Sequence, residues 1–348
     1  MKAMVLRGGA FVLDERPEPV PTRGQILVAT NTCGICGTDL HARHHLAAFL
    51  KGLQRSGSPI PTDATDDVIL GHEFCGEVLD HGPDTDTRFK PGTLVVGLPF
   101  VTGPQGADYV GYSNRFPGGF AERMVLTEKL AFAVPNGLDA TRAALTEPLA
   151  IGVHAVGRAV PQIPEAAVIL VVGCGPIGLS VIAALKARGL GPVIGVDYSS
   201  ARRRVAEAVG ADETIDANLE TQTDIWARTG AGKRRRAVVF ECVGRPGLVQ
   251  SIIEQVPPRA LVVVVGNVLG ESSIDQVIAF NKEIDICFTQ NYAPAEFGQT
   301  LHAIAEGQID VAPVLTGVVA PEQVEEAFAA LATPEKHAKI IISFETGR

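Results

Sequence analysis

The feature that most constrains the fold is an apolar run that leads directly into a glycine-rich turn. Every residue of Ala167–Val172 is apolar, as in a strand that is covered on both faces of a sheet. The turn that follows has the pattern GxGxxG at 173–178, and an Ala- and Leu-rich segment continues to about Arg188. A buried strand, a glycine turn and a helix in this order predict one unit of a parallel sheet with helices packed on it.

The sequence pattern divides the chain into two regions. Its 348 residues are enough for roughly two domains. Short strand-like segments broken by glycine and proline fill about the first 135 residues, which predicts a mostly β domain. From about Glu165, strand-like and helical segments alternate. This alternation predicts an α/β fold with a Rossmann-type, doubly wound parallel sheet beside the β domain.

The glycine-rich turn has the spacing of a dinucleotide-binding site. The first glycine permits a tight turn, the second lets the backbone approach a pyrophosphate, and the third lets the helix pack on the strand. The N–H groups at the start of the helix would then face the phosphates. A purely structural turn is the alternative.

Asp197 ends the next strand, where a carboxylate accepts the ribose hydroxyls of NAD and repels the 2′-phosphate of NADP. The basic residues at 202–204 lie near enough to take part, although an exposed helix face is the alternative for them. We therefore expect NAD to contact Gly173, Gly175, Pro176, Ile177, Gly178, Asp197 and Arg202.

A second group of residues has the composition of a metal site. Cys36 lies in a segment with several side chains that can bind a metal, and His72 and Glu73 are adjacent. Glu147 lies near the boundary between the β region and the α/β region. A catalytic zinc site needs three protein ligands and one open position, which Cys36, His72 and one of the two carboxylates would supply. Zinc bound there would polarise an alcohol oxygen and lower its pKa.

The run around Cys36 also supplies candidates for proton transfer. Thr38 and His41 would relay the released proton to solvent, since histidine titrates in the useful range. Asp39 is a candidate for orienting the ring of His72. A redox CxxC or half of a zinc ribbon is the alternative, but the chain has no second CxxC. The catalytic candidates are thus Cys36, Thr38, His41 and Glu73.

Together these motifs resemble the medium-chain, zinc-dependent alcohol and polyol dehydrogenase family. The matched segments follow the family's order across nearly the whole chain and are 36–41, 71–73, 147–149, 173–178 with Asp197, and 241–244. The resemblance implies a GroES-like catalytic domain at 1–150, a Rossmann domain at 151–290, and a return of the chain to the catalytic domain at 291–348.

The resemblance also implies roles for single residues. Cys36 and His72 resemble the first two zinc ligands, and Glu73 the neighbouring carboxylate. Glu147 resembles the carboxylate that sorbitol and threonine dehydrogenase relatives hold near the metal, which favours the polyol branch. Val243 and Lys339 match positions close to the cofactor, and Lys339 also matches a basic residue near the metal ligands.

Two departures from the family pattern matter. Residues 76–173 contain no cysteine, whereas relatives often carry a four-cysteine lobe, so we expect one catalytic zinc ion and no structural zinc. The 36 positions from Cys36 to His72 form a longer interval than usual. We place the extra residues at 44–67 and expect a helix and loop near the substrate cleft or a subunit contact. A surface insertion without a role is the alternative.

The sequence thus predicts a zinc-dependent oxidoreductase that moves a hydride between NAD and an alcohol, diol or polyol. One alternative is a dehydrogenase of the same fold that acts on a formaldehyde adduct or a cyclic hydroxylated compound. Another is an NAD-binding protein without turnover. The partner is then a small alcohol or its carbonyl product, whose identity one sequence does not reveal.

Charge and composition argue against several kinds of binding partner. The net charge of −9 argues against a nucleic-acid partner, and the glycines inside the apolar stretch 168–185 argue against a membrane span. The first residues lack a leader pattern and the six cysteines lack a disulfide framework, so we expect a cytoplasmic protein. We also expect a homodimer or homotetramer, for which 284–292 would supply an edge strand.

Overall fold

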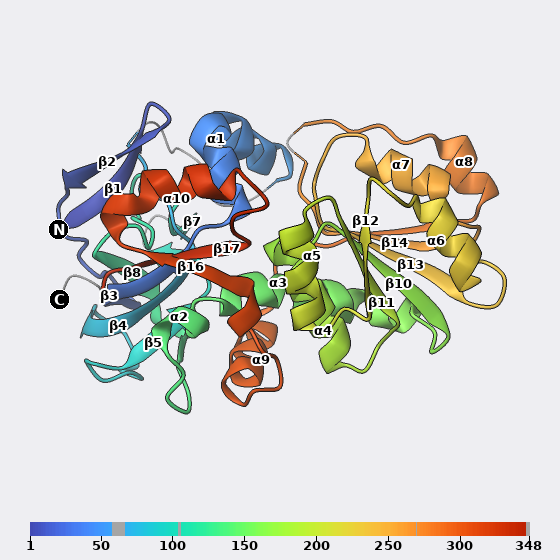
Figure 1. The fold of residues 1–348 in the computed structure, drawn as a ribbon. Coiled ribbons are helices and arrows are strands. Elements are labelled where there is room, and N and C mark those ends of the chain that lie inside the picture. The colour runs from blue at the N-terminus through green and yellow to red at the C-terminus, as the bar shows by residue number, and fades with distance from the viewer. Residues whose placement is uncertain (58–66, 104–105, 269, 346–348) are drawn as a thin grey trace.

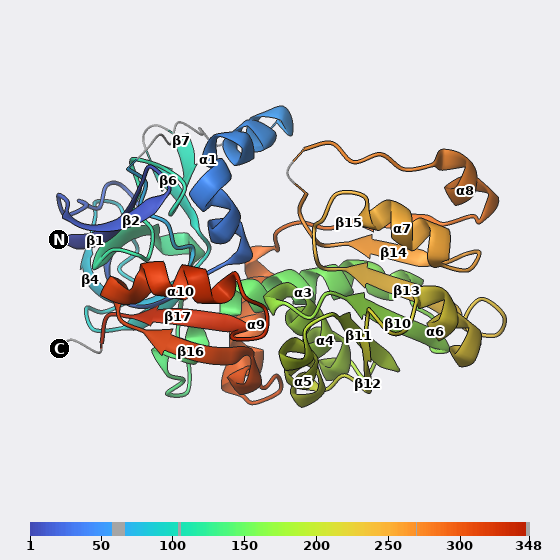
Figure 2. The same cartoon turned by 45° about the horizontal axis from the view of Figure 1, so that its top comes forward.

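The computed structural model describes residues 1–57, 67–103, 106–268 and 270–345, which form two lobes. Figure 1 shows that the first lobe contains both ends of the chain, in blue and red, whereas the middle of the chain builds the second lobe. The turned view in Figure 2 shows the same division. Strands from the last part of the chain therefore lie in the same sheet as strands from its first part.

The first lobe is centred on a seven-stranded sheet. Its strands, with those of two small sheets, are β1 (Lys2–Arg7), β2 (Ala10–Glu15), β3 (Gln25–Gly34), β4 (Glu73–His81), β5 (Leu94–Gly97), β6 (Phe100–Gly103), β7 (Gly106–Tyr109), β8 (Arg123–Thr127), β9 (Ala131–Ala133), β16 (Leu315–Val319) and β17 (Lys339–Ser343). The order in the main sheet is β16-β17-β3-β4-β5-β9, and β8 also pairs with β3. The helices of this lobe and of its junction are α1 (Gly37–Arg55), α2 (Ala140–Ala143), α3 (Thr146–Ala159), α9 (Pro294–Ala305) and α10 (Val324–Leu331).

The second lobe is a six-stranded sheet in which every strand pair is parallel. Its elements are β10 (Ala167–Val172), α4 (Pro176–Ala187), β11 (Val193–Asp197), α5 (Ser200–Val209), β12 (Glu213–Asp216), α6 (Gln222–Thr229), β13 (Arg236–Glu241), α7 (Leu248–Gln255), β14 (Leu261–Val264), α8 (Gln276–Asn281) and β15 (Asp285–Phe288). The spatial order is β12-β11-β10-β13-β14-β15. Counted along the chain this is 3-2-1-4-5-6, the order of a dinucleotide-binding Rossmann sheet, so the predicted fold class is confirmed.

Local sequence explains the turn that opens this sheet. Gly173 has φ of 93°, a conformation that only glycine adopts without strain. A Cβ added at Gly178 would lie 1.8 Å from the carbonyl oxygen of Gly173, so the third glycine lets α4 approach β10. The following helix, α5, has Ser199 as its N-cap and Gly210, in a left-handed conformation, as its C-cap.

The junction between the lobes is helical. α3 begins beside the first lobe's sheet and packs against both α4 and α9. Because α3 runs through residue 150, the domain boundaries at 150 and 290 stay predictions. Among the helices of the described ranges, none is long and apolar enough to cross a membrane.

Candidate functional site

Three of the predicted ligands meet where β3 ends and β4 begins. One ligand atom from each of Cys36, His72 and Glu73 lies within 4.8 Å of the other two. Cys36 is the N-cap of α1, directly after β3, and Glu73 opens β4 opposite Gly34 of β3. The antiparallel pairing of these two strands therefore brings the two sequence motifs to one place.

Two buried side chains hold the ring of His72. Its Nδ1 lies 3.4 Å from Oδ1 of Asp39 and 3.2 Å from the hydroxyl oxygen of Tyr112. The Tyr112 hydroxyl donates to Asp39 at 2.7 Å. Burial by itself lowers the pKa of His72, but the charges of Asp39 and Cys36 raise it well above its ordinary value. Asp39 thus contacts His72 as predicted, whereas Tyr112 carried no signal in the sequence.

Glu73 is paired with a lysine from the last strand. Glu73 and Lys339 are both completely buried and form an ion pair, and Lys339 also donates to the carbonyl oxygen of Ile35 at 2.9 Å. Burial lowers the pKa of Lys339, but the charge of Glu73 raises it above its ordinary value. The absence of a side chain at Gly34 provides the space for the carboxylate of Glu73, because a Cβ at residue 34 would lie 2.1 Å from Oε2 of Glu73. Lys339 therefore lies on the metal side, and its contact with the cofactor stays a prediction.

Glu147 lies on the first turn of α3, outside the cluster of three. Its Oε1 accepts a hydrogen bond from the hydroxyl of Tyr292 at 2.8 Å. Burial raises the pKa of Glu147 to about 7, while His72 lowers it and Glu73 raises it. The pKa of Glu147 therefore depends on the charges of His72 and Glu73, and the role of Glu147 as a ligand stays a prediction.

Thr38 and His41 lie on the first turns of α1. The N–H of Thr38 donates to Sγ of Cys36 at 3.4 Å, and His41 is exposed. Residues three apart lie on one side of a helix, so these two side chains point in similar directions from the cluster toward solvent. The proton relay that they would form stays a prediction.

The donor atoms of the cluster fit a zinc ion. Thiolate, imidazole and carboxylate are the three kinds of ligand that zinc takes in proteins. Oε1 of Glu73 is buried and has no hydrogen-bond partner among the described residues, which leaves an oxygen for a cation. Three ligands of mixed type match a catalytic zinc site, which keeps one position open, better than a closed structural site.

The glycine turn lies at the start of α4. No side chain caps this helix, which begins at Pro176, so its first N–H groups are available to an anion. The carboxylate of Asp197 accepts from the N–H groups of Cys174 and Ser199, each at 2.8 Å. These two bonds hold Asp197 beside the turn, next to the place where a dinucleotide would lie.

Arg202 and Val243 border the same turn. Nη1 of Arg202 lies 3.9 Å from the position of a Cβ on Gly175, and its buried Nε has no hydrogen-bond partner among the residues described. Cγ2 of Val243 lies 2.6 Å from the position of a Cβ on Gly173. Glu241 accepts a hydrogen bond from the N–H of Val243 at 2.7 Å and so holds the backbone of Val243 in place beside the turn. In the sequence, Glu241 stood out only as part of the motif 241–244.

The described part of the predicted insertion continues α1, which is kinked at His45. The expected helix is therefore present, while 58–66 lies outside the described residues. The ring of Phe49 lies 5.2 Å from the ring of Tyr112, and Arg55 donates to Glu271 of the second lobe at 3.4 Å. The inserted helix thus contacts both the surroundings of the metal cluster and the opposite lobe.

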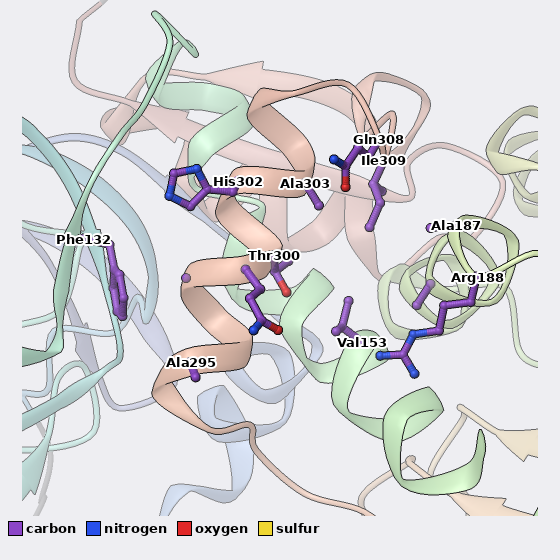
Figure 3. Close-up of a pocket in the computed structure, with 13 residues that line it drawn as sticks. Phe132, Val153, Ala187, Arg188, Ala295, Thr300, His302, Ala303, Gln308 and Ile309 are labelled. Atoms are coloured by element: carbon purple, nitrogen blue, oxygen red, sulfur yellow. The ribbon is translucent and has the colours of Figure 1, made fainter. Parts of the chain in front are cut away.

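A cavity of about 610 Å³ lies along α9. Figure 3 shows Arg188 and Val153 on one side of this helix and Phe132 on the other. Its lining includes no residue of the metal cluster or of the glycine turn. We therefore assign the chemistry to the cluster and not to this cavity.

A cluster of three metal-ligand side chains in one lobe and a glycine turn suited to a dinucleotide in the other are the features of a metal-dependent oxidoreductase. The family model of the alcohol dehydrogenase GroES-like domain matches residues 22–136, and that of the zinc-binding dehydrogenases matches residues 176–306.

Individual relatives agree with these models. (R,R)-butanediol dehydrogenase of Bacillus subtilis is 31% identical, over 93% of this chain and 94% of that protein. Sorbitol dehydrogenase of the same organism is 29% identical, over 94% of this chain and 92% of that protein. The crystal structure of 2R,3R-butanediol dehydrogenase from Bacillus subtilis superposes with a TM-score of 0.82 at 28% identity, covering 98% of this chain and 99% of that one.

The chain belongs to the zinc-dependent medium-chain alcohol and polyol dehydrogenase family. It is an enzyme, an NAD-linked alcohol dehydrogenase that depends on zinc. The resemblance that the sequence motifs indicated is confirmed.

Proposed function

We propose that the enzyme transfers a hydride between NAD and a hydroxyl-bearing carbon of a small diol or polyol, at the centre formed by Cys36, His72 and Glu73. The observation that carries this proposal is the convergence of their three ligand atoms. The names of the relatives, a butanediol and a sorbitol dehydrogenase, support a substrate with more than one hydroxyl group. The hydrogen-bonded pair of Glu147 and Tyr292 would supply polar contacts for the second hydroxyl.

Each residue of the centre then has a defined task. A zinc ion held by Cys36, His72 and Glu73 would supply a Lewis acid for the substrate oxygen. Thr38 would take the proton from the substrate hydroxyl during oxidation and pass it along α1 to His41, and the reverse path would return it during reduction.

The second lobe would hold NAD in preference to NADP. Asp197 supports this preference, because its fixed carboxylate would accept ribose hydroxyls and repel a 2′-phosphate. The N-terminus of α4 would bind the pyrophosphate, with Arg202 as a further cation beside it. Val243, which packs on Gly173, would contact the cofactor from the opposite side.

A substrate panel tests the proposal. NADH absorbance would be followed with vicinal diols, sugar alcohols, simple alcohols, formaldehyde adducts and cyclic hydroxylated compounds, with and without a chelator. Turnover of diols or polyols that a chelator abolishes and zinc restores is the expected result. Cys36→Ser should lose zinc and activity, whereas Cys287→Ser, distant in the second lobe, should keep both. NAD binding without turnover of any alcohol would refute the proposal.

We further propose that the protein works as a homodimer or homotetramer in the cytoplasm. β15 is the last strand in the order of its sheet; its residue Phe288 is 66% exposed, and Val277 and Phe280 on the preceding helix α8 are 68% and 81% exposed. Large exposed apolar side chains at a sheet edge favour burial against another subunit. The six free cysteines support a reducing compartment.

A further inference from the structure

We propose that Tyr112 is a positioning residue that fixes the ring of His72 at the metal centre, and that it links the inserted helix to that centre. The inference rests on the proposed function, because it takes His72 as a metal ligand. It goes beyond that function because it assigns a role to a residue that lies in none of the sequence motifs.

The contacts of Tyr112 determine which nitrogen of His72 faces the metal. The hydroxyl of Tyr112 donates its proton to Asp39 at 2.7 Å, so its oxygen is an acceptor toward Nδ1 of His72 at 3.2 Å. Asp39 offers Nδ1 a second acceptor at 3.4 Å. Two acceptors on one side keep the proton on Nδ1, and the lone pair of Nε2 is then available to a metal ion.

Ring packing adds to these bonds. The rings of Tyr112 and His72 have centroids 5.3 Å apart at a tilt of 43°, and Tyr112 is buried. On its other side Tyr112 contacts Phe49 with a centroid distance of 5.2 Å. Phe49 belongs to the inserted part of α1, so this helix supports the ligand through one intermediate ring.

The segment that carries Tyr112 is anchored by its own charged groups. The buried carboxylate of Asp108 accepts from the hydroxyl of Ser113 at 2.8 Å and pairs with Arg115. The N–H of Gly111 donates to the carbonyl of Phe116 at 3.2 Å. These bonds close the loop on both sides of Tyr112 and leave its hydroxyl in a fixed place.

The same loop rests directly on the segment that precedes β4 and carries the ligand His72. A Cβ on Gly111 would lie 3.0 Å from the carbonyl oxygen of Gly71, the residue before His72. A Cβ on Gly118 would lie 2.3 Å from the carbonyl oxygen of Leu70. Glycines at both places let the two backbones touch, so a shift of the loop would also shift the ligand.

The test replaces Tyr112 with phenylalanine in the full-length, zinc-loaded enzyme and follows the transfer of zinc to a chromogenic chelator. Loss of a partner behind a metal-bound histidine typically costs about tenfold to a hundredfold in metal affinity or activity, so zinc should leave faster by roughly that factor. The cobalt-substituted variant should show a changed visible spectrum. kcat should fall, while the KM for NAD should stay the same.

Two variants make the result decisive. Tyr109→Phe removes a hydroxyl from the last residue of β7, three positions before Tyr112, where the ring packs against Phe100, and should leave zinc release unchanged. Phe49→Leu keeps the Tyr112 hydroxyl but loosens its support, and should speed zinc release by a smaller factor. It also serves as the test should Tyr112→Phe fail to fold.

Zinc release and a cobalt spectrum that match the wild type in both Tyr112→Phe and Phe49→Leu would overturn the inference. Zinc release needs no substrate, so the two proposals can fail separately. If the wild-type protein oxidises no alcohol but the Tyr112→Phe variant releases zinc faster than the wild type, only the proposed function is refuted.

Discussion

Replacing Lys339 with methionine should destabilise the metal-free protein much more than the zinc-loaded protein. Lys339 and Glu73 are both completely buried, so the substitution leaves an unpaired carboxylate inside the first lobe. Removing one partner of a buried ion pair costs about 3–5 kcal/mol. At roughly 2–4 °C per kcal/mol, the melting temperature of this lobe should fall by about 6–20 °C. A divalent cation next to Glu73 replaces the missing charge, so zinc should restore much of the loss.

Calorimetry with chelator and with saturating zinc measures both values. Lys51→Met on the exposed side of α1 is a matched control that should change stability by less than about 0.5 kcal/mol. The double variant Glu73→Gln/Lys339→Met should be more stable in chelator than Lys339→Met alone, because no charge is left unpaired. An equal loss for Lys339→Met with and without zinc would refute the reasoning from the ion pair.

Three other substitutions probe separate parts of the molecule. Glu147→Gln should stabilise the metal-free protein more at pH 8 than at pH 5, because a carboxyl with a pKa of about 7 when folded and 4.5 when unfolded weakens the fold as the pH rises between these values, by about 3 kcal/mol at most. Urea unfolding at the two pH values measures this, and an equal effect at both would contradict it. Asp197→Ser should lower kcat/KM for NAD roughly tenfold to a hundredfold through lost charged hydrogen bonds and should favour NADP, whereas an unchanged ratio of the two cofactors would exclude this role. Phe288→Arg should lower the mass found by light scattering, while Leu219→Arg, at a residue that is even more exposed but follows the strand at the other edge of the sheet, should not; an unaltered mass for Phe288→Arg would argue against the β15 contact.

Much of the second lobe could be predicted from the sequence because its signals are local. The apolar run and the three glycines at fixed spacing each act within a few residues. The right-handed connections between parallel strands then restrict the strand orders that such a chain can adopt. Arg203 shows the limit of this reasoning, since neither a role at the cofactor nor the alternative of an exposed helix face anticipated its ion pair with Asp216.

The ligands of the first lobe could be predicted for a different reason. Cys36, His72 and Glu73 are residue types that bind zinc, and each belongs to a recognisable motif. Asp39 could be predicted as a partner of His72, but the two supporting tyrosines could not, because Tyr112 and Tyr292 are single residues outside any motif. They reach His72 and Glu147 through tertiary packing over 40 and 145 positions, which no local pattern encodes. The ion pair of Lys339 depends in the same way on how β17 pairs with β3.

The position of β17 also bears on synthesis and truncation. The ribosome makes β3 and the metal-binding motifs early, but the neighbour of β3 on one side is formed by residues 339–343, which emerge only after the whole second lobe. The second lobe is contiguous in the chain, so it can complete its sheet while the first still waits. A premature stop before residue 339 would therefore yield a product whose nucleotide lobe folds normally, while its metal-binding lobe lacks a central strand and the buried lysine that balances Glu73.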